Sequence, residues 1–266
     1  MKIEVNRIDI DYRDEGEGLP VVFIHAFPLN QTMWDEQVAA LRGTCRAITL
    51  DMRGFGRSGF GSSSHSIDEM ASDVRGLMNK LGIDRAVLVG LSMGGYVSLA
   101  FYRNHPGCVH ALVLADTRAG GDTQEAREWR TKSAEKAERE GSVAIADDMV
   151  PLLLGRSSLG SRPDLIARTR EMIEANSPAG IAAAQRAMAA RRDSTDLLAT
   201  INFPVMVIVG SEDSLTPLAE AETMNRAIRG SRLQVIEGAG HLSNLEQPRL
   251  FNAALSEFIQ PIERRG

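Results

Sequence analysis

The sequence predicts an α/β fold in which a mostly parallel, doubly wound sheet of eight strands carries a helical insertion after its sixth strand. Three observations support this prediction. Short apolar runs recur along the chain, helical patterns separate most of them, and one long segment between two of the runs contains helical patterns only. Strands that alternate with helices are typical of a parallel sheet covered by helices on both faces.

The strands are predicted from two kinds of pattern. Apolar alternation from Ile3 to Tyr12 indicates two antiparallel strands with a turn near Asn6 and Arg7. The other strands are continuous apolar runs, as expected where both faces of a parallel sheet are buried. These runs cover residues 19–24, 47–50, 86–89, 111–114, 205–209 and 232–236.

Helical patterns occupy the intervals between the apolar runs. One of them opens at Ser66, where Ser66 and Glu69 have the spacing of a capping box. A further helix is expected directly after Ser92. The others cover residues 32–41, 66–82, 217–228 and 247–259.

The segment 117–196 contains no convincing strand. Its helical patterns cover residues 123–140, 142–154, 163–175 and 178–191. We therefore predict a core of residues 1–116 and 197–266 and a helical cap of residues 117–196, which together form one structural unit. Such a cap would lie over the carboxyl edge of the sheet, where ligands bind in folds of this kind.

Composition excludes several classes of function. The 266 residues carry a net charge of −5, whereas a nucleic-acid binder needs a surplus of Lys and Arg. Binding to an anionic membrane is disfavoured for the same reason, and no stretch approaches the roughly 20 apolar residues of a membrane span. The sequence thus favours a partner that is a small molecule, and it leaves the oligomeric state open.

The ends and the cysteines favour a cytoplasmic protein. The first residues alternate in polarity like a strand, unlike the apolar centre of a signal peptide. Cys45 and Cys108 are interpreted as free thiols in a reducing compartment. No Cys/His cluster has the spacing of a metal site, so we expect neither a metal nor an organic cofactor.

Ser92 is the predicted nucleophile. The segment from Val89 to Gly95 reads VGLSMGG and contains G-x-S-x-G between an apolar strand and a helix. Small residues allow the sharp turn that lifts a serine hydroxyl above the sheet edge, and the helix N-terminus favours developing negative charge. The alternative is a glycine-rich turn that serves close packing only.

A serine hydroxyl needs a base, and His241 is the predicted one. It lies in a glycine-rich loop after the last expected strand, at the edge where Ser92 is also expected. His65, His105 and His110 are interpreted as surface or packing residues. His25 is interpreted as holding the shape of its own loop.

The carboxylate that orients this base is predicted to be Asp213, which follows the run 205–209. The chain order Ser92, Asp213, His241 is the order expected for a fold with this serine motif. Asp116 is the main alternative, since it ends another strand, although a turn or cap role also fits it. Glu212 is expected to point elsewhere, toward solvent.

Two backbone amides are predicted to bind the oxyanion. One is the N–H of Met93, the residue after the nucleophile, and the other is the N–H of Phe27, in the loop after residues 19–24. Pro28 has no N–H to donate.

Together these motifs resemble the alpha/beta-hydrolase superfamily over nearly the whole chain. The segments DMRGFGRS (51–58) and HLSNLEQP (241–248) are similar to a loop and to the catalytic-histidine segment of that superfamily. The chain most resembles small bacterial carboxylesterases and 3-oxoadipate enol-lactonase-like proteins. One departure is Ala26, where the family usually has glycine, and a β-carbon there restricts positive φ.

The resemblance implies hydrolysis of a small, short-chain carboxylic ester through an acyl-enzyme on Ser92. Enol-lactone hydrolysis, carbon–carbon bond hydrolysis, cofactor-free perhydrolysis and a slow-turnover signalling protein are the alternatives. Relatives with an aspartate nucleophile are disfavoured, because residue 92 is serine.

Substrate choice is expected to depend on the cap. Apolar cap residues are candidates for the pocket, although helical spacing also fits an ordinary core: Met149, Leu152, Leu153, Leu154 and Met188. Cap arginines that would suit a carboxylate-bearing substrate are interpreted first as a solvated charged face: Arg118, Arg127, Arg130, Arg191 and Arg192.

Overall fold

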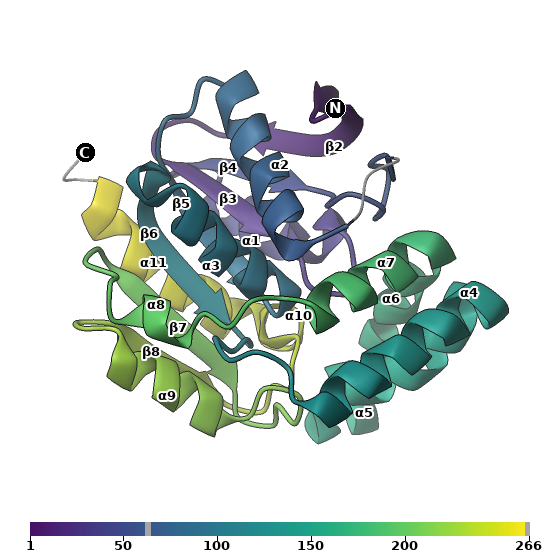
Figure 1. The fold of residues 1–266 in the computed structure, drawn as a ribbon. Helices are drawn as coiled ribbons and strands as arrows, with labels where there is room; N and C mark the ends of the chain where they lie inside the picture. The colour runs from purple at the N-terminus through teal and green to yellow at the C-terminus, as the bar shows by residue number, and fades with distance from the viewer. Residues whose placement is uncertain (62–64, 264–266) are drawn as a thin grey trace.

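A computed structural model describes residues 1–61 and 65–263 of the protein, and its centre is a twisted sheet (Figure 1). In this part of the chain the sheet has eight strands in the order β1-β2-β4-β3-β5-β6-β7-β8. The strands from β3 to β8 run parallel, while β2 pairs antiparallel with both β1 and β4. The strands are β1 Lys2–Val5, β2 Ile8–Glu15, β3 Pro20–Ile24, β4 Arg46–Leu50, β5 Ala86–Leu91, β6 Val109–Ala115, β7 Val205–Gly210 and β8 Arg232–Ile236.

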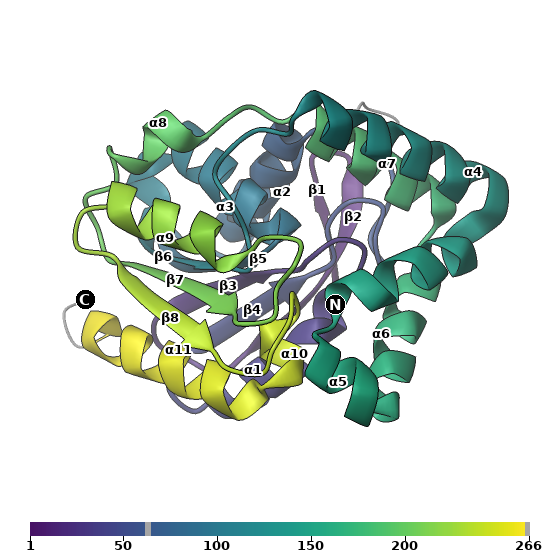
Figure 2. The same cartoon turned by 90° about the horizontal axis from the view of Figure 1, so that it is seen from below.

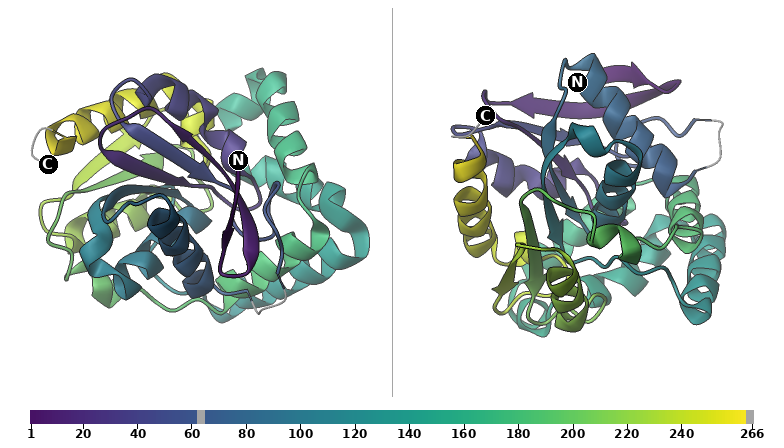
Figure 3. Two further views of the ribbon diagram at one scale, coloured as in Figure 1. Left: turned by 90° about the horizontal axis from the view of Figure 1, so that it is seen from above. Right: turned by 60° about the vertical axis from the view of Figure 1, so that its left-hand side comes forward.

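The β1–β2 hairpin forms one edge of the sheet and β8 forms the other (Figure 3). Asn6 and Arg7 connect the hairpin with positive φ angles of 49° and 66°, so the predicted turn is confirmed. The inner strands β5 and β7 are buried along their whole length, which explains their continuous apolar sequences.

Helices cover both faces of the sheet, as Figure 2 shows. Helices α1 and α11 pack together on one face, and α2, α3 and α9 lie on the other. The capping interaction predicted at the start of α2 is present, because Ser66 Oγ accepts the N–H of Glu69 at 3.0 Å. These helices and their short neighbours are η1 Gln31–Trp34, α1 Asp35–Leu41, α2 Ile67–Lys80, α3 Met93–Asn104, η2 Pro106–Cys108, α9 Leu218–Ala227, α10 Ser243–Glu246 and α11 Pro248–Glu263.

The insertion between β6 and β7 is helical, as the sequence predicts. Helix α4 packs on α6 and α7 beyond one end of the sheet (Figure 1). Gly141 interrupts α4 with a φ of 85°, which agrees with the break expected between 140 and 142. The helices of the insertion are α4 Gln124–Leu153, α5 Arg156–Ser161, α6 Pro163–Glu174, α7 Pro178–Ala189 and α8 Thr195–Leu198.

The division into core and cap at residues 117 and 196 stays a prediction, and its second boundary falls within α8. Within residues 1–61 and 65–263, no helix combines the length and the apolar character that crossing a membrane requires.

Candidate active site

Ser92 stands at a sharp turn between β5 and α3. Its φ of 56° and ψ of −112° are unusual for a residue with a side chain. The turn brings two stretches of backbone so close together that no side chain fits between them. A β-carbon on Gly90 would lie 2.2 Å from the carbonyl oxygen of Gly94. Two hydrogen bonds hold the turn, from the Ser92 N–H to the Ala115 carbonyl at 2.9 Å and from the Thr117 hydroxyl to the Ser92 carbonyl at 2.8 Å.

The structure brings Ser92, His241 and Asp213 together, although they lie far apart in the sequence. His241 Nε2 is 2.8 Å from Ser92 Oγ, and His241 Nδ1 is 2.9 Å from Asp213 Oδ2. An ionised carboxylate can only accept hydrogen bonds, so His241 Nδ1 carries the hydrogen. His241 Nε2 is then free to accept the serine proton. This is the geometry that a serine nucleophile with a histidine base requires.

The Asp213 carboxylate is held by its own loop. Oδ1 accepts the N–H groups of Leu215 and Thr216, both at 2.9 Å, and Oδ2 accepts the Thr216 hydroxyl at 2.6 Å. Burial acts to raise the pKa of the Asp213 carboxyl, but the charge of His241 and the hydrogen bonds from His241 and Thr216 outweigh it. The pKa therefore lies below its usual value, and the group stays ionised beside the imidazole.

Asp116, the alternative acid, does not face His241. It is fully buried at the end of β6, where its Oδ1 accepts the Gly210 N–H at 2.8 Å and its Oδ2 accepts the Ser243 hydroxyl. Burial and the nearby charge of Asp213 raise its pKa well above the usual value. Asp116 thus connects the end of β7 with the short helix that follows His241.

Glu212 also points away from His241, as expected, and its contacts with the insertion are exposed to solvent. Its carboxylate accepts the N–H and the hydroxyl of Ser157 in α5. The other histidines lie elsewhere: His65 packs on Phe60, His105 packs on Phe101, and His110 lies near the start of β6. Each of these three fits the packing or surface role expected from the sequence.

The loop after β3 approaches Ser92 from the other side. His25 is buried there, and its Nε2 accepts the Met52 N–H at 3.0 Å while Nδ1 lies 2.9 Å from the Ala26 carbonyl. Burial lowers the pKa of His25, so its imidazole is neutral and holds the loop. Ala26 has no positive φ, so the alanine that replaces the family's glycine fits this backbone without strain.

Of the two predicted oxyanion donors, Phe27 shares a cavity with the nucleophile and Met93 directly follows it in the chain. Phe27 lines the cavity that contains Ser92 and His241. Met93 is the first residue of α3, and the first amides of a helix have no partner within the helix. The role of each N–H as an oxyanion donor remains a proposal.

The cavity beside Ser92 is small, about 70 Å³. Of the predicted apolar lining residues, Met149, Leu153 and Met188 border it. Leu152 does not, because it lies on the outer side of α4 and is 38% exposed. Leu154 is buried without bordering the cavity.

The sequence did not predict several other residues that border the cavity. Tyr96 lies one helical turn after Ser92, a spacing that was available as a signal. Trp129 also borders the cavity and is 44% exposed, but nothing in its sequence surroundings indicates this position. Leu215 and Thr216 also border the cavity, and they belong to the loop that carries Asp213.

The five cap arginines divide into two groups. Arg127 and Arg192 are exposed, as the prediction of a solvated face requires. The prediction is wrong for Arg191, which is buried, and for Arg118 and Arg130, which border the cavity beside Ser92.

The fold and this site define an alpha/beta hydrolase. The family model described as "alpha/beta hydrolase fold" matches residues 20–248, and the chain belongs to this family. The chain is 31% identical over 243 residues to 3-oxoadipate enol-lactonase 1 of Acinetobacter baylyi, covering 91% of this chain and 89% of that one.

Two solved structures are similar over almost their whole length. A thermophilic esterase from Thermogutta terrifontis, with malate bound, has a TM-score of 0.95 and 41% identity, covering 99% of this chain and 98% of the other. The enol-lactonase from Burkholderia xenovorans has a TM-score of 0.91 and 30% identity, covering 98% and 100% of the two chains.

Proposed function

We propose that the protein is a serine carboxylesterase that hydrolyses small, short-chain carboxylic esters through an acyl-enzyme on Ser92. The observation that carries this proposal is the continuous hydrogen-bonded series from Ser92 Oγ through His241 to Asp213, at 2.8 Å and 2.9 Å. The similarity to an esterase at 41% identity supports the same class of reaction.

In the proposed mechanism, His241 accepts the Ser92 proton as Ser92 Oγ bonds to the ester carbonyl carbon. The N–H groups of Phe27 and Met93 stabilise the oxyanion, and loss of one such donor typically raises the barrier by roughly 2.7–4 kcal/mol. His241 then protonates the departing alkoxide, which leaves as an alcohol. Water attacks the acyl-enzyme in the second half, gives its proton to His241, and releases the acid and free Ser92.

The size of the cavity favours short substrates. A volume of about 70 Å³ bordered by Met149, Leu153 and Met188 leaves room for a small acyl or alcohol group. A long acyl chain would have to displace these buried side chains or extend past Trp129 into solvent.

The test is hydrolysis of p-nitrophenyl esters from acetate to long-chain acyl, with Ser92→Ala alongside. We expect kcat/KM to peak at the short chains and activity to disappear in the variant, which retains the fold. Well-folded protein that turns over no ester in the series would contradict the proposal.

Enol-lactone hydrolysis is the second candidate, favoured by the similarity to two enol-lactonases. A lactone carbonyl meets the same groups, but its leaving oxygen stays attached to the acyl chain. An enol-lactone whose kcat/KM exceeds that of every short ester would favour this candidate.

A further inference from the structure

Two arginines and no acidic residue border the cavity beside Ser92, among the residues that the structure describes there. The two are Arg118 and Arg130. Arg118 follows Thr117, whose hydroxyl donates to the Ser92 carbonyl at 2.8 Å, so the backbone of Arg118 is fixed close to the nucleophile. A neutral ester has no group that needs this charge.

One buried carboxylate, Asp122, is the shared partner of three arginines. Its ion pairs are with Arg118 at 3.2 Å, Arg130 at 2.5 Å and Arg191 at 2.6 Å. Burial acts to raise the pKa of Asp122, but the charges of Arg130 and Arg191 outweigh it, so the group is ionised. Three positive charges and one negative charge leave a net charge of +2 (3 − 1) in this cluster.

Arg191 already has partners in α3 and in the insertion. Its guanidinium lies 4.1 Å from the centre of the Tyr96 ring and donates to the carbonyls of Met188 and Gly120. Arg130 donates two further hydrogen bonds, to Gln185 at 2.9 Å and to the sulfur of Met188 at 3.5 Å.

The guanidinium of Arg118 has more N–H donors than hydrogen-bond partners. It donates to Asp122 through one terminal nitrogen, and its Nε is buried with no hydrogen-bond partner in the described part of the chain. Tyr96, which also borders the cavity, acts on Arg118 electrostatically and through a side-chain hydrogen bond, and Glu220 acts on it electrostatically without bordering the cavity. A guanidinium presents five N–H donors, and leaving a buried donor unpaired is unfavourable.

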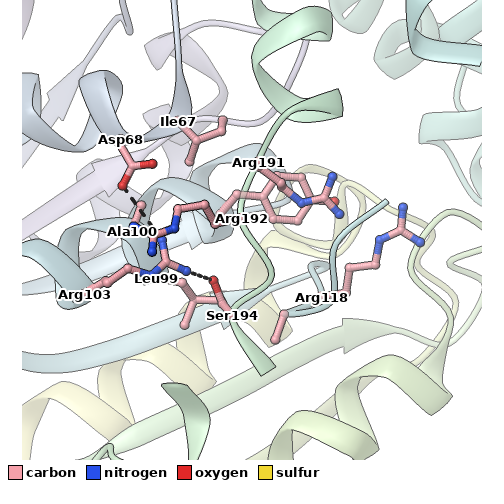
Figure 4. A pocket seen from close by; sticks show the side chains of 11 residues that line it. Ile67, Asp68, Leu99, Ala100, Arg103, Arg118, Arg191, Arg192 and Ser194 are labelled. Carbon is pink, nitrogen blue, oxygen red and sulfur yellow. Dashed lines mark hydrogen bonds and ion pairs between the residues drawn. The ribbon is translucent and has the colours of Figure 1, made fainter. Parts of the chain in front are cut away.

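A second cavity shares Arg118 and Tyr96 with the first. Figure 4 shows Arg118 among the residues that line this second cavity. Its volume is only about 10 Å³, which is room for about one water molecule. Arg103, on the same wall, is already paired with Asp68 and Ser194. Of these two cavities, the one that contains Ser92 is therefore the one with room for a ligand beside Arg118.

We propose that Arg118 and Arg130 form an anion subsite beside Ser92, which binds a carboxylate on the substrate. The substrate class is then a short ester or lactone that carries a second, ionised carboxyl group. This inference rests on the proposed ester hydrolysis at Ser92. It changes the expected substrate from a neutral ester to an anionic one.

The test compares substrates that differ in charge but hardly in shape. Monomethyl glutarate is paired with methyl glutaramate, and 4-acetoxybutanoate with 4-acetoxybutanamide, so the carboxylate lies on the acyl side in one pair and on the alcohol side in the other. We expect the anionic member of at least one pair to have the higher kcat/KM by about tenfold, equivalent to about 1.4 kcal/mol. The preference is expected to shrink as salt is added.

Arg118→Gln and Arg130→Gln are expected to lower the ratio of anionic to neutral kcat/KM toward one, and Arg118→Lys to retain part of it. Arg127→Gln is the matched control, because Arg127 lies on the same helix as Arg130 but is exposed and does not border the cavity. Its ratio should equal that of the wild type. Equal turnover within both pairs in the wild type would overturn the subsite and leave the esterase proposal intact.

A binding measurement on the wild type keeps the two proposals separable. Calorimetry with glutarate and with glutaramide needs no turnover and no variant. Binding of glutarate but not glutaramide would support the subsite even if no ester were hydrolysed, in which case only the proposed function would fail. If no ester were hydrolysed, absence of glutarate binding would reject the subsite as well.

Discussion

Two buried aspartates near His241 have opposite electrostatic environments. Asp213 receives hydrogen bonds from Leu215, Thr216 and His241, and its pKa is lowered. Asp116 is more deeply buried and close to the charge of Asp213, and its pKa is raised. Carboxyl groups whose surroundings separate their pKa values in this way generally serve different roles.

We therefore expect Asp213→Asn and Asp116→Asn to differ in their effect on kcat. Asparagine at 213 would favour the wrong tautomer of His241 and lower kcat by about 10⁴, as in other serine triads. Asparagine at 116 can still accept from Gly210 and can donate to Ser243, so kcat should fall less than about tenfold. Steady-state kinetics on folded variants measures this, and the reverse order would make Asp116 the catalytic acid.

The pH dependence of stability checks Asp116 separately. Because its native pKa is raised, the folded protein binds a proton that the unfolded chain releases above a pKa of about 3.9. The contribution of Asp116 to wild-type stability should therefore decrease as the pH rises from about 4 toward its native pKa. Asp116→Asn removes this contribution. The thermal midpoint of the variant minus that of the wild type should therefore increase as the pH rises. A constant difference between pH 4 and 9 would contradict this.

At the residue scale, the sequence was sufficient to predict the site residues that lie just after the ends of strands. Ser92, Asp213 and His241 each come soon after an apolar run, and parallel strands bring such ends to one edge. Leu152 was predicted wrongly because its side depends on helical phase. Residues 149 and 153 share a face, whereas Leu152 is turned by about 100° from Leu153.

At the scale of elements, α3 lies unusually close to the sheet. A β-carbon on Gly94 would lie 2.1 Å from the carbonyl oxygen of Ile24 in β3, and the obstacle is backbone, which cannot rotate away. The glycines of the serine motif thus permit both the turn and the packing of the helix that follows it. The glycine-rich turn therefore serves close packing, as the alternative interpretation of this motif expected, and this packing role is compatible with a nucleophilic Ser92.

Gly94→Ala is expected to lower the free energy of unfolding by at least about 1–3 kcal/mol, since overpacking moves α3 away from β3. Gly107→Ala is the matched control, because no atom lies within 4 Å of its β-carbon position. Urea denaturation of both variants measures the difference. Equal stability of the two would show that α3 shifts without cost.

The elements that sequence patterns missed are short. Helices α5, α8 and α10 have six, four and four residues, too few for an apolar period of 3.6 to repeat. Their positions depend on contacts across the fold. For example, the N–H of Gly155, just before α5, donates to the buried carboxylate of Glu246 at 2.9 Å.

At the scale of the whole molecule, the insertion is fastened to the loops that carry the site. Glu246 accepts the N–H of Gly155 from the insertion and the N–H of Gly240, the residue before His241. On the opposite side, Asn176 lies between α6 and α7 and reaches the loop that contains Phe27. No local sequence pattern predicts the contacts of Gly155 with Glu246 and of Asn176 with Pro28, because these partners are 91 and 148 residues apart.

Asn176 makes the more extensive of these connections. It is 3% exposed, its amide group donates to the carbonyls of Pro28 at 2.7 Å and Leu29 at 3.2 Å, and its oxygen accepts the Gly56 N–H at 2.6 Å. The side chain thereby fixes the backbone directly after Phe27. Removing it leaves two carbonyls and one amide of the core without this partner.

Asn176→Ala is therefore expected to lower both stability and kcat. The unpaired groups should decrease the free energy of unfolding by about 1–3 kcal/mol. A shift of the Phe27 N–H should lower kcat for short esters by about 10- to 100-fold with little change in KM, because that donor acts on the transition state. Asn104→Ala is the control, since Asn104 is exposed and bonds only to Asp68 among its described side-chain contacts. A loss of stability with kcat unchanged would mean that Asn176 holds the insertion in place without positioning the oxyanion loop.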